Sequence, residues 1–334
     1  MANISDVAAL AGVSAATVSR ALNGKSTVDP ELVIRVRRAA TELGYHPNGL
    51  ARSLRTQTTA VLALIISDVE NPFFTAIARG VEDVAQTAGF SVVLCNSDEN
   101  PDKERRYLGV ALQERMAGVV LSPGGQPPDL GALLRRGTPV VAVDRPLHQV
   151  DQVLVDTRRA AAEATAHLLA GGYRRIGCVT GPAGIHTADD RLAGYRDALR
   201  AAGMAVHGPS ESLVRRVEYR ADGGADAARE LLRAAHPPDA LLVANSAQAI
   251  GVLETLTGSG LRLGADLGMV AFDDVRWATL IDPPLTVVAQ PAYDIGAVAA
   301  QLLLDRVGER ATEARPPRVR TLAARLIERG SSRR

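Results

Sequence analysis

The sequence predicts an α/β protein with a small helical head and a larger core of parallel, doubly wound sheets in two lobes. The first 59 residues contain short helical patterns and a basic excess, with seven Lys and Arg against four Asp and Glu. From residue 61 onward, apolar runs of strand length alternate with helical stretches, which is typical of parallel sheets covered on both faces. Ten such runs exceed one comfortable sheet, so two α/β lobes are expected.

The head is predicted to be three short helices, each with recognisable ends. Gly12 ends the first helix, and Ser14 is a good N-cap for the second. Asp29 is the expected N-cap of the third, with Pro30 at its first position and Gly44 at its end. We expect helices over residues 4–11, 15–22 and 30–43, a short segment over 49–55 and a polar linker over 56–59.

The core is predicted from its alternating pattern. Strands are expected at residues 61–67, 90–96, 118–122, 139–144, 153–156, 175–180, 213–219, 240–245, 267–272 and 285–290. Helices are expected at 74–89, 103–117, 158–170, 190–202, 222–235 and 246–258.

Composition excludes several classes of protein. An apolar fraction of 46% excludes a disordered chain, and no apolar stretch reaches the roughly 18 residues of a membrane span. The N-terminus lacks the basic and apolar regions of a signal peptide. Cys95 and Cys178 both lie in apolar runs and are expected to be buried free thiols. These features favour a cytoplasmic protein.

Enzyme motifs are missing from the sequence. It contains no Gly-x-x-x-x-Gly-Lys-Ser/Thr loop and no Gly-x-Ser-x-Gly elbow, and its six histidines show no metal-ligand spacing. His186 is expected to lie in a loop or at a rim. We therefore expect no catalytic residue, no metal and no cofactor.

The first two helices fit a helix-turn-helix plan, in which the second helix presents its N-terminal turn to the major groove of DNA. Thr17 and Ser19 can bond phosphates or base edges, whereas Ala15 and Ala16 can only touch thymine methyl groups. A small three-helix bundle without a ligand is the alternative. The expected DNA-binding residues of the head are Ser14, Ala15, Ala16, Thr17, Ser19, Arg20 and Asn23.

Two strings separate these alternatives. Ile4-Ser5-Asp6-Val7-Ala8 with Ala11-Gly12-Val13-Ser14 and Thr17-Val18-Ser19-Arg20-Ala21-Leu22-Asn23 closely resembles the head of the lactose/galactose-repressor (LacI/GalR) family of bacterial transcription regulators. Gly44-Tyr45-His46-Pro47-Asn48 with Ala51-Arg52-Ser53-Leu54 resembles the hinge of that family. The resemblance covers essentially the whole chain and implies a homodimer bound to near-palindromic operator DNA.

The hinge is expected to act as a switch. The resemblance implies that this helix folds only on the operator and that Leu54 wedges into the minor groove. A lone helix of this length is shorter than the ~12–15 residues that are stable in water. An apolar wedge unstacks the bases and bends the groove. The local alternative is that Leu54 packs within a linker helix.

The resemblance also implies a core like the periplasmic sugar-binding proteins, in which two lobes close on a ligand at the carboxyl ends of the strands. It implies a helix-turn-helix domain over 1–47, a hinge helix and linker over 48–59, a first lobe over 60–158 plus 290–318, and a second lobe over 159–289 plus 319–330. No apolar heptad follows residue 327, so a dimer is expected rather than a tetramer.

Several polar and aromatic residues stand at the ends of the predicted strands, and their chemistry suits a pyranose. Carboxylates accept from hydroxyl groups, guanidinium groups donate, and amides do both. Aromatic rings can sandwich the C–H faces of the sugar. The set resembles the site of ribose-binding proteins and ribose-type repressors. The expected effector residues are Asn71, Phe73, Phe74, Asp144, Arg145, Arg191, Tyr219, Asn245, Asp273 and Gln290.

Individually these residues have plain alternatives, since Asp144-Arg145 could be a surface ion pair and Phe73 and Phe74 could be core. Many members of the family carry Asp after the equivalent of Asn245, whereas Ser246 stands here and can also cap a helix. The favoured function is a sugar-responsive repressor that ribose or a related aldose releases from its operator. The alternatives are a purine, a nucleoside or a phosphorylated carrier protein as the effector, or a sugar-binding protein without a DNA role.

Overall fold

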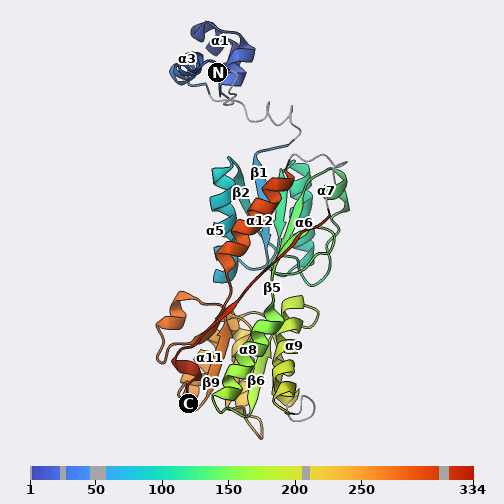
Figure 1. The fold of residues 1–334 in the computed structure, drawn as a ribbon, viewed down its shortest axis with the longest axis vertical. Coiled ribbons are helices and arrows are strands. Elements are labelled where there is room, and N and C mark those ends of the chain that lie inside the picture. The colour runs from blue at the N-terminus through green and yellow to red at the C-terminus, as the bar shows by residue number, and fades with distance from the viewer. Residues whose placement is uncertain (1, 23–27, 46–57, 205–210, 308–315) are drawn as a thin grey trace. The chain divides into compact units, whose positions relative to one another are not determined.

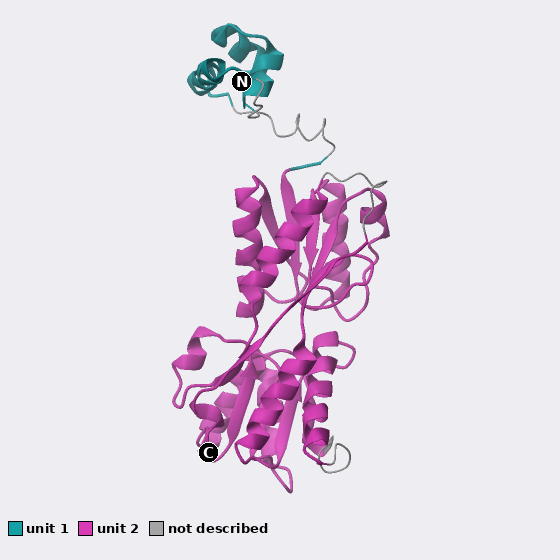
Figure 2. Ribbon diagram, in the orientation of Figure 1, with its two compact units in different colours: residues 1–59 teal, residues 60–334 magenta. Residues whose placement is uncertain are grey.

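The computed structural model describes residues 2–22, 28–45, 58–204, 211–307 and 316–334. The chain divides into two compact units, residues 1–59 and 60–334 (Figure 2). Within the described ranges, no helix is long and apolar enough to span a membrane.

In the head, the predicted helices form as α1 (Ile4–Ala11), α2 (Ala15–Leu22) and α3 (Pro30–Glu42). Gly12 ends α1 with a φ of 63°, a left-handed conformation that glycine adopts without strain. Ser14 Oγ accepts the Thr17 amide at 3.1 Å, as expected of an N-cap. The three helices bury one small core, made of Val7, Ala8, Ala11, Val18, Ala21, Val36, Ala39 and Ala40.

The first lobe is built on a six-stranded sheet with the order β11-β5-β4-β3-β1-β2 (Figure 1). Its strands are β1 (Val61–Ile66), β2 (Ser91–Asn96), β3 (Gly118–Leu121), β4 (Val140–Val143), β5 (Asp151–Val155) and β11 (Val319–Leu322). Its helices are α5 (Pro72–Thr87), α6 (Pro101–Gln113), α7 (Gly131–Arg135) and α12 (Ala292–Arg306). One hydrophobic cluster joins α5 and α12 to the sheet, and a second joins α6 and α7 to it.

The second lobe repeats this plan with the strand order β12-β10-β9-β8-β6-β7. Its strands are β6 (Ile176–Thr180), β7 (Val214–Arg216), β8 (Ala240–Val243), β9 (Gly268–Phe272), β10 (Thr286–Ala289) and β12 (Arg325–Ile327). Its helices are α8 (Thr157–Ala170), α9 (His186–Ala201), α10 (Ala221–Leu232) and α11 (Ser246–Ser259), with short 3-10 turns at Glu211–Leu213, Arg276–Thr279 and Gly330–Ser332. The predicted fold class is confirmed.

One predicted boundary is wrong. The sequence assigned residues 319–330 to the second lobe, but β11 pairs in parallel with β5 of the first lobe. Only β12 pairs with the second sheet, antiparallel to β10. The chain changes lobe between Leu322 and Arg325, and a link this short leaves no compositional sign of the crossing.

Helices that share a sheet face cross closely at glycines. A Cβ on Gly80 of α5 would collide with the backbone of Tyr293 on α12, and one on Gly296 would collide with the backbone of Ile77. The same contact is made by Gly194 for α8 and α9, and by Gly224 and Gly251 for α10 and α11. These glycines let the two helices of each pair pack backbone to backbone, which fixes the position of each helix on its sheet.

Candidate functional site

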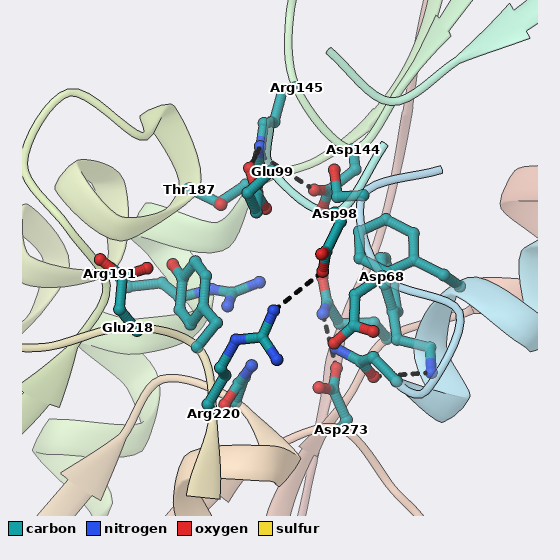
Figure 3. A pocket seen from close by; sticks show the side chains of 17 residues that line it. Asp68, Asp98, Glu99, Asp144, Arg145, Thr187, Arg191, Glu218, Arg220 and Asp273 are labelled. Carbon is teal, nitrogen blue, oxygen red and sulfur yellow. Dashed lines mark hydrogen bonds and ion pairs between the residues drawn. The ribbon is translucent and has the colours of Figure 1, made fainter. Parts of the chain in front are cut away.

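A pocket lies between the two lobes, and the carboxyl ends of both sheets contribute to it (Figure 3). All ten residues predicted for the effector site line this pocket. Whether they bind an effector stays a prediction. The full lining is Ser67, Asp68, Asn71, Phe73, Phe74, Asp98, Glu99, Asp144, Arg145, Thr187, Arg191, Glu218, Tyr219, Arg220, Asn245, Asp273 and Gln290.

Two phenylalanines supply an apolar wall from the first lobe. Asn71 is the N-cap of α5, and its side chain accepts the Phe73 amide at 3.0 Å. The rings of Phe73 and Phe74 meet edge to face, with centroids 5.2 Å apart, and both are buried. Both rings also belong to the first lobe's hydrophobic cluster. They are therefore part of the core, as the alternative had it, and they line the pocket as well.

Each lobe places one aspartate at the same point of its sheet. Asp144 follows β4 and Asp273 follows β9. Both have left-handed backbones, with φ of 67° and 76°, and both donate their amides to the next strand, to Val153 and Val288. Burial raises the pKa of both carboxyls, although Arg191 acts in the opposite direction. Such strained, poorly solvated carboxylates gather at binding sites.

Arg145 is held from several sides inside the first lobe. Its guanidinium donates to Glu99 Oε2 at 2.8 Å and to the Pro123 carbonyl at 2.9 Å. Asp144 Oδ2 lies 3.5 Å from its Nε. Burial opposes the charge of Arg145, but Glu99 and Asp144 together raise its pKa above the ordinary value. The surface ion pair considered from the sequence is wrong, because Arg145 is buried.

The second lobe contributes the guanidinium of Arg191 and the amide of Asn245, and the connection after β10 contributes the amide of Gln290. Arg191 donates to the Ala244 carbonyl, and its guanidinium carbon lies 4.2 Å from the centre of the Phe272 ring. Gln290 Nε2 donates to Asp273 Oδ1 at 2.8 Å. Among the described residues, Arg191 Nε and Gln290 Oε1 are buried without a hydrogen-bond partner. Arg191 therefore retains an unused donor, and Gln290 retains an unused acceptor.

Three details differ from the prediction. The helix that carries Arg191, α9, begins at His186 and not at residue 190 as predicted. Tyr219 does not end a strand, since β7 stops at Arg216. Its ring packs on Gly181, where a Cβ would collide with it. Asn245 itself caps α11 by accepting the Gln248 amide at 2.8 Å, so the cap does not come from Ser246.

Sequence reasoning missed seven lining residues. Ser67 and Asp68 follow β1, and Asp98 and Glu99 follow β2. The strand-end rule could have found these four. Thr187, Glu218 and Arg220 lie near the starts of helices or in the loop after β7, where the sequence pattern gives no such signal.

The head exposes four of the residues predicted to read DNA. Ser14, Ala15, Ala16 and Arg20 are exposed, and Thr17 and Ser19 are half-buried. The hydroxyl groups of Ser14 and Thr17 lie 2.9 Å apart and bond each other. Asn23 and Leu54 lie outside the described residues.

Comparison with known proteins gives consistent matches. Residues 3–48 match the family described as bacterial regulatory proteins, lacI family, and residues 165–332 match a periplasmic binding protein-like domain. The chain is 37% identical to a ribose operon repressor of Halalkalibacterium halodurans, over 92% of this chain and 91% of that protein.

Solved structures are also similar. One is the lac repressor dimer bound to operator and an anti-inducer, with a TM-score of 0.84, 25% identity, and coverage of 100% of this chain and 99% of that one. Another is a LacI family regulator from Enterococcus faecium with bound ribose, with a TM-score of 0.73, 25% identity, and coverage of 82% and 98%.

Proposed function

The chain belongs to the lacI family of bacterial regulatory proteins, and we propose that it is a sugar-responsive transcriptional repressor whose effector is D-ribose or a closely related aldose. The pocket between the lobes is its effector site. The observation that carries this proposal is the pocket's chemistry: planar acceptors and donors from both lobes surround a space walled by the rings of Phe73, Phe74 and Tyr219. Such a set can hold hydroxyl groups at the edges of a sugar and its C–H faces between the rings.

The charges of the pocket favour a neutral ligand. Its described lining contains six carboxylates and three guanidinium groups. Arg145 already contacts Glu99 and Asp144, and Arg220 contacts Asp98. The charge of Arg191 acts on Asp144 and Asp273. Because each cation faces carboxylates, a phosphate group would meet net negative charge here. We therefore propose an uncharged sugar and not a sugar phosphate.

The DNA-binding role rests on the head. The relative solved on operator is a dimer, and we propose that two copies of this chain likewise bind a near-palindromic operator, one head on each half-site. Effector binding would change the angle between the lobes, separate the two hinges and weaken the contact with DNA. In this scheme Leu54 of each hinge enters the minor groove on the operator.

We propose that the pocket binds its ligand without converting it. The family that the chain matches consists of bacterial regulatory proteins, and a relative 37% identical to the chain is a ribose operon repressor. In the described ranges no group of three or more His, Cys, Asp or Glu could hold a metal ion.

The test is calorimetry on the full chain with D-ribose, other pentoses, hexoses, purines and nucleosides, followed by a mobility-shift assay on operator DNA. We expect ribose or a close aldose to bind and to release the operator. Tight binding of a purine or nucleoside alone would overturn the effector and leave the repressor. Failure to bind any double-stranded operator would overturn the repressor.

A further inference from the structure

An ion pair joins the two lobes at the pocket. Arg220, just before α10 in the second lobe, donates from Nη2 to Asp98 Oδ1 at 2.8 Å. Asp98 follows β2 in the first lobe, and both residues line the pocket (Figure 3). Their side chains are 61% and 38% exposed, whereas those of Arg145 and Asp144 are 4% and 6% exposed. The pair therefore lies on the solvent side of the pocket, at its mouth.

Arg220 contacts the opposite lobe and does not cap the helix that it precedes. It occupies the N-cap position of α10 but makes no side-chain cap bond. Ser, Thr, Asp and Asn are strongly preferred at this position because they satisfy the free amides of the first turn. An arginine there leaves the helix start uncapped by a side chain, and its guanidinium reaches the opposite lobe instead.

Asp98 is presented by a strained but anchored segment. Asp98 and Glu99 have φ of 55° and 53°, the left-handed region that non-glycine residues rarely adopt. The segment is fixed by the Ser97 amide, which donates to the Ile66 carbonyl at 2.8 Å, and by the Glu99 amide, which donates to the Ser67 carbonyl. As a result Glu99 binds Arg145 within its own lobe, while Asp98 contacts Lys103 in its own lobe and Arg220 in the other.

We propose that Asp98 and Arg220 form a latch across the mouth of the pocket, which holds the lobes closed around a single sugar ring and which a ring with an outward substituent must break. This inference rests on the proposed function for the nature of the ligand. Since the pair is partly exposed, its contribution to closure is modest. Its effect is measurable in selectivity, because a substituent that separates the two charges loses the contribution of the pair and gains no compensating contact from them.

The test compares two serine variants of the full chain. Arg220→Ser removes the latch and provides a helix cap, so its Tm should equal or exceed that of the wild type. Lys103→Ser is the matched control, because Lys103 Nζ lies 3.4 Å from the same Asp98 carboxylate but in the same lobe. Calorimetry is done with D-ribose and with methyl β-D-ribofuranoside.

In Arg220→Ser we expect ribose to bind about threefold more weakly, and the preference for ribose over the methyl glycoside to shrink by about three- to fivefold. Asp98→Asn should act in the same way, and the double variant should add little to either single one. Lys103→Ser should leave the preference unchanged. An unchanged preference in Arg220→Ser, or an equal change in Lys103→Ser, overturns the latch.

A second measurement needs no ligand. Hydrogen exchange of the free protein should be faster in peptides covering residues 96–100 and 217–224 for Arg220→Ser than for the wild type or Lys103→Ser. Equal exchange in all three proteins overturns the latch. If no sugar binds to any of them, the proposed function fails, and the exchange comparison decides the latch alone.

Discussion

Replacing Asp273 in the pocket by Asn should weaken the binding of ribose without lowering the stability of the fold. Asn tolerates the left-handed backbone that Asp273 adopts, with its φ of 76°. It also keeps an acceptor for Gln290 Nε2, which lies 2.8 Å from Asp273 Oδ1. The change removes the negative charge that faces Arg191 and one acceptor oxygen, Oδ2, which lies 3.4 Å from the Ser246 amide and can also accept from a sugar hydroxyl.

The expected size of the effect follows from these contacts. A hydrogen bond to a charged group contributes about 1.5–3 kcal/mol, so ribose should bind about 10- to 150-fold more weakly to Asp273→Asn. The effect on stability has the opposite sign. Burial raises the pKa of Asp273, so the folded state holds this proton more tightly than the unfolded chain does. Stability is therefore lost as the pH rises through the raised pKa. At neutral pH the variant should melt no lower than the wild type.

The assay is calorimetry with ribose together with thermal unfolding at pH 7. Asp274→Asn is the control, because it removes the same charge from the next residue along the chain. The Asp274 carboxylate pairs with Arg329 at 2.7 Å and does not line the pocket. Ribose affinity within twofold of the wild type in Asp273→Asn would refute the site. An equal loss in Asp274→Asn would show that the change in net charge, and not the pocket contact, is responsible.

Three further outcomes are expected. Deleting residues 1–57 should abolish operator binding in a mobility-shift assay and leave ribose binding intact, and retained operator affinity would contradict the role of the head. Sedimentation of the full chain should give a mass near two chains, since a palindromic operator needs two heads; a stable mass near four would argue against this. Asp151→Asn should lower the unfolding free energy by about 2–4 kcal/mol, because the buried carboxylate accepts from Arg306 at 2.9 Å and from Arg318 at 3.0 Å. Burial opposes the charge of Asp151, but these bonds lower its pKa. The stabilisation should therefore be present at neutral pH and be lost as the pH falls through the lowered pKa of Asp151. Denaturant unfolding at several pH values checks this, and an unchanged unfolding midpoint in Asp151→Asn would be the contrary result.

The strand-end rule explains why much of the pocket could be predicted from the sequence. Asp144 and Asp273 each follow a short buried strand directly, and Asn245 follows one after Ala244; parallel strands bring such ends to one edge. Arg220 could not be found in this way, because its position before α10 is decided by a loop and its partner lies in the other lobe.

The division of the last strands was also beyond the sequence. β11 and β12 are separated by Ala323 and Ala324 alone, yet they belong to different sheets. Their alternating pattern is compatible with one continuous strand. Which sheet each half joins is decided by pairing with β5 and β10, a tertiary contact that no local pattern records.

Because the two lobes repeat the same strand order, each presents the carboxyl ends of its strands to the same pocket. A ligand there would be bound by two linked half-sites. Both lobes line the pocket, with Asp144 on one side and Asp273 on the other, and three short connections join the lobes, at residue 156, residues 290–291 and residues 323–324. A sugar held by one lobe meets the other at an effective concentration that these connections set. Lengthening the connection at residue 156 or at residues 323–324 should therefore weaken binding of the proposed sugar without altering any residue that lines the pocket.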